Sequence, residues 1–147
     1  MAQNVIVPII DLTSAAEGST VPQNLQTALA FGSQNAFSVS NTSATIINNT
    51  GFYKIYGNMN IETYAGGISA KFELTNGLTN KTLLDFKSDN GSGSRSYSEI
   101  FEFVVFIAAG ESLIGSTDYS RASLIGSYRQ IADINGTLVN PSGFNPQ

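Results

Sequence analysis

The chain has 147 residues, of which only 12% are charged, and its formal net charge is −4. It contains no cysteine and no histidine, which excludes disulfide bonds, thiolate chemistry and the commonest general base and metal ligand. Its seven cations are scattered along the chain, so a basic nucleic-acid-binding surface is disfavoured.

Strand patterns follow one another along the chain. Alternating or β-branched runs bounded by turn residues predict β-strands, and we expect them at 36–40, 44–48, 52–63, 68–75, 81–87, 97–107, 112–117 and 123–134. Asn135-Gly136 is typical of a type I′ hairpin turn. About eight to ten short strands with turns roughly every ten residues predict an all-β sandwich or barrel.

The regular strand rhythm begins only after the first part of the chain. We therefore predict an extended N-terminal arm over residues 1–20 and one domain over 21–147. Its apolar piece "NVIVPII" lacks the basic region of a signal peptide. The stretch 21–32 has partly helical spacing, but we favour an extended entry into the first strand. No run has the length of a transmembrane helix, so no membrane association is expected.

The segment "YSEIFEFVVFIAAG" (97–110) is apolar on both faces of the predicted strand. One face carries Tyr97, Phe101, Phe103, Val105 and Ile107, because alternate side chains of a strand point to opposite sides. The other face carries Ile100, Val104 and Phe106. A strand in an antiparallel sheet usually needs only one apolar face. The second face therefore needs a cover, and the sequence leaves open which set faces the core.

Residues capable of catalysis are few. Glu99 and Glu102 lie three apart on the strand, so they point to opposite faces and cannot act on one bond. The glycine-rich loop 88–96 lacks the lysine and the following helix of a phosphate-binding motif. We predict no enzyme activity, no metal and no cofactor.

Three short motifs, in the same order, resemble those of the tumour-necrosis-factor-like trimeric jelly rolls. Gly51, Tyr53 and Ile55 occupy a G-x-Y-x-aromatic position, with Ile55 in place of the aromatic residue. "FIAAGESLI" (106–114) matches an apolar-x-x-G-[DE]-x-apolar hairpin, and "SLIGSYRQI" (123–131) loosely matches the last strand. The resemblance covers about residues 30–134 and implies a jelly-roll β-sandwich.

The resemblance also implies a homotrimer, in which neighbouring copies cover the second apolar face. The residues expected in the trimer interface or the core are Tyr53, Ile55, Ile100, Phe101, Phe103, Val104, Val105, Phe106, Ile107 and Tyr128.

The low-charge composition, rich in Asn, Ser, Thr and Gly, is similar to that of bacteriophage virion proteins. We therefore expect a head decoration (cement) protein that lies on the capsid surface, is made in the host cytoplasm, and binds the major capsid protein or another virion protein. Its arm would dock by β-augmentation through Val5, Ile6, Val7, Ile9 and Ile10. The alternative is a receptor- or glycan-binding head of a phage fibre or tail, which would use loops such as 88–96 and 118–122.

Overall fold

The computed structural model describes residues 35–63, 67–88 and 95–139. The predicted arm, its apolar docking residues and the stretch 21–32 lie outside the described residues, as does the boundary between arm and domain. Within the described part no helix has the length and apolar character that crossing a membrane requires.

Eight strands make up the described structure. They are β1 (Asn35–Ser40), β2 (Ser43–Ile47), β3 (Gly51–Thr63), β4 (Ser69–Thr75), β5 (Asn80–Lys87), β6 (Arg95–Ile107), β7 (Ser112–Thr117) and β8 (Ala122–Ala132). Each lies within one or two residues of a predicted strand, because β-branched and aromatic alternation between turn residues is a strong local signal.

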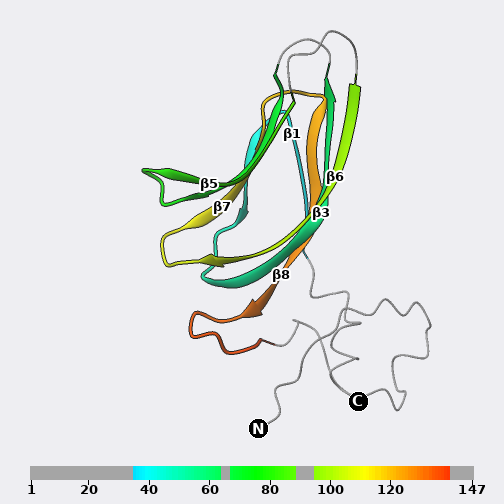
Figure 1. Cartoon of the computed structure of the whole chain (residues 1–147). Coiled ribbons are helices and arrows are strands. Elements are labelled where there is room, and N and C mark those ends of the chain that lie inside the picture. The colour runs from blue at the N-terminus through cyan, green and yellow to red at the C-terminus, as the bar shows by residue number, and fades with distance from the viewer. Residues whose placement is uncertain (1–34, 64–66, 89–94, 140–147) are drawn as a thin grey trace, which may run out of the picture.

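The strands form two antiparallel sheets. Sheet A has the order β1-β8-β3-β6 and sheet B the order β2-β7-β4-β5. The chain passes from one sheet to the other at nearly every connection, and the two sheets face each other as layers (Figure 1). Two four-stranded sheets joined in this way are a jelly roll, which confirms the predicted all-β fold.

The core lies between the sheets and contains many aromatic residues. Phe72 of β4 is completely buried. Its ring lies 5.0 Å from that of Phe101 and 5.3 Å from that of Phe103, both in edge-on arrangements. Such pairs add about 0.5–1.5 kcal/mol each beyond the burial of their area.

Two glycines let β3 and β8 approach closely beneath the aromatic cluster. Gly57 and Gly126 are direct partners in the ladder. A Cβ atom on Gly57 would lie 2.3 Å from the carbonyl oxygen of Ile125 and 2.7 Å from the ring of Phe101. A side chain at this position would therefore collide with backbone as well as with the core.

The turn after β8 differs from the prediction. Only Gly136 has a positive φ, of 79°, and Asn135 does not, so the type I′ turn, which needs positive φ at both residues, is not formed. Asp133 organises the turn instead, because its Oδ1 accepts hydrogen bonds from the backbone N–H groups of Asn135 and Thr137. The resulting C-terminal hairpin (residues 133–139) projects past the end of β8 (Figure 1).

Candidate functional site on the outer face of sheet A

The structure distinguishes the two apolar sets of β6. Phe101, Val105 and Ile107 point into the core, with exposed fractions of 4%, 7% and 0%, and Phe103 packs against the core. Ile100 and Val104 are 69% and 57% exposed, and Phe106 is 37% exposed. The second set therefore lies on the outer face of sheet A, where the described residues leave it uncovered.

Neighbouring strands extend this apolar surface. Phe52 is opposite Phe106 in the β3–β6 ladder, and their rings lie 4.7 Å apart. Tyr56 of β3 and Ile125 of β8 lie on the same side of the sheet and are 54% and 49% exposed. We call this surface the apolar face; it consists of Phe52, Tyr56, Ile100, Val104, Phe106 and Ile125.

Charged groups are embedded in the apolar face. Lys54 Nζ lies 2.6 Å from Glu102 Oε1, between the apolar residues of β3 and β6. Arg129 lies opposite Lys54 on β8, and partial burial lowers the pKa of its guanidinium. The charge of Lys54 is neutralised by Glu102, and Arg129 is partly desolvated. Both arrangements are compatible with a protein–protein contact, and arginine and aromatic residues are enriched in the cores of such contacts.

Several residues predicted for the interface or the core lie deep inside the sandwich. Tyr53 and Ile55 are buried, and Tyr128 packs against the core. The rings of Tyr53 and Tyr128 are 6.1 Å apart. Burial, with a smaller contribution from Tyr128, raises the pKa of Tyr53.

Sequence reasoning did not single out Phe52, Tyr56 and Ile125. Phe52 and Tyr56 alternate with Lys54 and Asn58 along β3, and this pattern is typical of an ordinary solvated face. They form part of the apolar face only because they lie beside apolar residues of β6, and the register of the sheet determines which residues are neighbours. In the sequence, only β6 indicated an apolar outer face, because both of its faces are apolar.

The outer face of sheet B is polar. Lys71 pairs with Glu73 at 3.1 Å, and Lys87 pairs with Asp85 at 2.9 Å. Desolvation disfavours the ionised form of Asp85, but hydrogen bonds from Lys87 and Ser69, together with nearby lysines, outweigh it and lower its pKa. Glu73 is buried, whereas Lys71, Asp85 and Lys87 are at least partly exposed to solvent.

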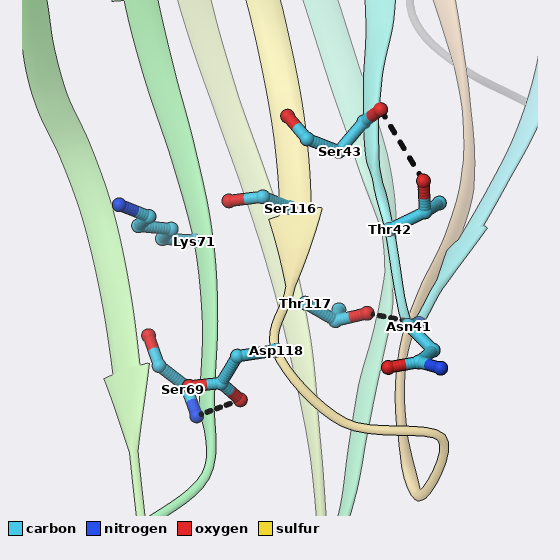
Figure 2. Close-up of a pocket in the computed structure, with 8 residues that line it drawn as sticks. All are labelled: Asn41, Thr42, Ser43, Ser69, Lys71, Ser116, Thr117 and Asp118. Carbon is cyan, nitrogen blue, oxygen red and sulfur yellow. Dashed lines mark hydrogen bonds between the residues drawn. The ribbon is translucent and has the colours of Figure 1, made fainter.

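A shallow polar groove of about 500 Å³ crosses one end of sheet B. Figure 2 shows its lining, in which Asp118 accepts a hydrogen bond from the backbone N–H of Ser69, and Thr117 accepts one from that of Asn41. Among the described residues, the Ser116 hydroxyl is buried without a hydrogen-bond partner. The lining residues are Asn41, Thr42, Ser43, Ser69, Lys71, Ser116, Thr117 and Asp118.

The residues that the structure describes contain no cluster of three or more Asp, Glu, His or Cys side chains that could hold a metal ion.

Comparison with known proteins connects this fold to phage capsids. Two solved structures, described as pentameric capsid proteins isolated from metagenomic phage sequences, superimpose on the chain with TM-scores of 0.68. The first is 35% identical to this chain, and the alignment covers 95% of this chain and 86% of the capsid protein. The second is 36% identical, and the alignment covers 93% of this chain and 90% of the capsid protein. No protein-family model matches the sequence, and no curated protein matches it.

The fold and the comparisons define a jelly-roll protein of the phage-capsid class. Identity above 30% over nearly the whole of both chains shows that this chain belongs to the same family as these capsid proteins. A further solved structure, the Eiger tumour necrosis factor of S. frugiperda, is 17% identical over 67% of this chain and 68% of its own, with a TM-score of 0.39. That likeness is too weak to carry any argument. The predicted relationship to phage virion proteins is confirmed, whereas the relatives form pentamers and not the expected trimers.

Proposed function

We propose that this chain is a structural protein of a phage virion and that it assembles with copies of itself into a fivefold ring. The observation that carries the proposal is the apolar face of sheet A. Contiguous exposed apolar surface is uncommon on soluble monomers and marks interaction sites. Family membership with pentameric capsid proteins supports a second copy of the chain as the cover.

The number of copies is proposed from the relatives and not from the sequence. The expected trimer rested on three short motifs that resemble those of a jelly-roll family and on the need to cover a second apolar face, and analogy with a fold family is a weak basis for function. Relatives about one-third identical over nearly the whole chain are pentameric, so five copies replace three in the proposal. Both assemblies would cover an apolar face of the same kind.

The polar sheet supports a position at the surface of the virion. Its paired charges and hydroxyl groups are compatible with water, so sheet B would face solvent while the apolar face is covered within the ring. We retain the predicted role of a decoration protein attached to the shell formed by the major capsid protein. Docking through Val5, Ile6, Val7, Ile9 and Ile10 remains a prediction about residues outside the described structure. The capsid-protein relatives also support a non-catalytic role.

Electron microscopy of the purified full chain tests the assembly. Negatively stained particles should give class averages with fivefold symmetry. Averages with threefold symmetry, or single-chain particles, would contradict the proposed ring. Incubating the rings with purified capsids of the phage that encodes the chain, followed by sedimentation, then tests attachment, and rings that stay entirely in the supernatant would contradict the decoration role.

The polar groove supports a second candidate function, glycan or receptor binding. Its lining of hydroxyl, amide and charged side chains provides hydrogen-bonding groups of the kind that sugars use. A glycan array probed with the wild-type chain tests this function. Selective binding that is lost in Asp118→Ala would support it, and an array without selective signal would reject it.

A further inference from the structure

A ring of five like copies constrains the surfaces that meet. Contacts in a closed ring of more than two copies are heterologous, so one patch of each copy meets a different patch of the next. If the apolar face of sheet A is one of these patches, it meets a different surface of the next copy. Given the proposed ring, which the pairing below presupposes, a second exposed apolar surface on the same chain would be a suitable partner for it.

The C-terminal hairpin carries such a surface. Ile134 and Leu138 are 55% and 54% exposed on this short projecting turn. The turn is internally fixed, because Asp133 Oδ1 accepts two backbone hydrogen bonds and the backbone N–H of Asp133 donates to the carbonyl oxygen of Thr137 at 2.8 Å. A preorganised projection loses little conformational freedom when it binds.

The hairpin and most of the apolar face lie on opposite sides of β8. Phe52 of β3 pairs with Ala132 on one side of β8, and Leu138 bridges to Ala132. A strand has only two hydrogen-bonding edges, and β3 occupies one edge of β8. Leu138 therefore lies along the other edge, which pairs with β1 nearer the start of β8. Five of the six residues of the apolar face belong to β3 or β6, the two strands on the far side of β8 from the hairpin, namely Phe52, Tyr56, Ile100, Val104 and Phe106.

Two apolar surfaces at opposite edges of one sheet suit head-to-tail association. The copy that receives a hairpin on its β6 side can offer its own hairpin from its β1 side to the next copy. An isologous contact through the apolar face alone would join two copies and then stop.

We propose that the C-terminal hairpin of one copy packs Ile134 and Leu138 against the β3–β6 half of the apolar face of the next copy. The occupant of the apolar face is thereby a defined segment of a second copy of this chain. The contact repeats around the ring until it closes.

Two variants separate the two sides of the contact. Ile100→Asp disables the apolar face, and the double change Ile134→Asp with Leu138→Asp disables the hairpin. All three side chains are more than half exposed, so each chain should fold, which circular dichroism melting verifies. Leu78→Asp is the matched control, because Leu78 is 93% exposed in the β4–β5 turn and belongs to neither surface.

Native mass spectrometry of each full-length variant gives the test. Wild type and Leu78→Asp should be pentamers, and the face and hairpin variants should be monomers. An equal mixture of the two monomeric variants should contain a two-chain species with one copy of each, because one intact face then meets one intact hairpin. Mixing either variant with itself should give no dimer.

The outcomes separate this inference from the proposed function. A pentameric hairpin variant would overturn the hairpin contact while leaving the ring intact. A mixture without the two-chain species would overturn the direct pairing. A monomeric wild type would overturn the ring itself, and the pairing with it.

Discussion

The outer faces of the two sheets belong to the same sandwich and yet are built for different surroundings. Sheet A exposes a phenylalanine pair, a tyrosine and aliphatic side chains around the Lys54–Glu102 ion pair, and a second pair, Glu62–Arg121, lies at one end of the sheet. Sheet B carries hydroxyl groups and two ion pairs, of which only Glu73 is buried. Both inner faces are apolar, because both contribute to the core.

This difference indicates which surface the fold needs for stability and which it needs for assembly. A strand needs one apolar face to fold in a two-layer sandwich. The second apolar face of β6 adds nothing to the core, and the proposed contact between copies would account for its apolar character. The polar face of sheet B has no such requirement.

The largest effect is expected from placing one charge on each outer face. Val104→Asp should convert the ring to single chains, because a carboxylate would replace an apolar side chain and would have to be desolvated between copies, a cost that its neighbour Lys54 offsets only in part. Thr45→Asp is its counterpart on sheet B, where the exposed side chain is similar in shape, and it should leave the mass unchanged. Analytical ultracentrifugation of both variants gives the comparison. A ring that survives Val104→Asp, or is lost in Thr45→Asp, would refute the assignment of the two faces.

The next effect concerns the glycines on the inner faces of the two sheets. Gly57→Ala should destabilise the fold by about 3 kcal/mol, the upper end of the usual cost of overpacking, since its Cβ would meet the backbone of β8. Gly115→Ala in sheet B should cost about 1 kcal/mol, because its Cβ would meet the movable end of Ile46 at 2.8 Å.

Urea unfolding in the Val104→Asp background measures both costs without any contribution from assembly. Equal destabilisation by the two alanines would show that the close approach of β3 and β8 has no special role.

Ion pairs on the two faces should also differ in their importance. Lys54→Met should weaken assembly by about 2 kcal/mol or more, because it leaves Glu102 without its partner inside a contact between copies. Lys87→Met removes a solvent-exposed pair on sheet B and should change the free energy of unfolding by less than about 0.5 kcal/mol. Dilution series followed by light scattering measure the first change and urea unfolding the second. A ring equally stable to dilution with and without Lys54 would place this pair outside the contact.

The smallest effect is a pH dependence inside the core of sheet A. Because the pKa of Tyr53 is raised in the folded state, its contribution to stability is complete below the unfolded value of about 10 and falls as the pH rises above it. Tyr53→Phe should therefore lose less stability than wild type between neutral and strongly alkaline pH. Thermal melting across that range makes the comparison. If wild type and Tyr53→Phe lost stability in parallel as the pH rises, the pKa of Tyr53 would be the same in the folded and unfolded states.

Strand positions could be predicted from the sequence because their signals are local. Alternating runs between turn residues located β3 and β4, and β6 stood out as apolar on both faces. The side of β6 that faces the core could not be predicted, because both sets are equally apolar and only packing against β3 and sheet B distinguishes them. Phe52, Tyr56 and Ile125 join Ile100 through the cross-strand register, which no single strand encodes.

The turn at Asn135-Gly136 shows that a local sequence signal can also predict the wrong geometry. The dipeptide favours a type I′ turn, but the carboxylate of Asp133 accepts two backbone hydrogen bonds and selects another geometry. The number of copies also could not be predicted from fold resemblance, since an apolar outer face needs a cover but does not specify how many copies supply it.

Light scattering of the full-length chain during size-exclusion chromatography most directly tests whether copies of the chain cover the apolar face. The proposed ring predicts a single species with about five times the 15.6 kDa mass of one chain. A species with the mass of one chain would contradict it, because the apolar face of sheet A would then be exposed to water.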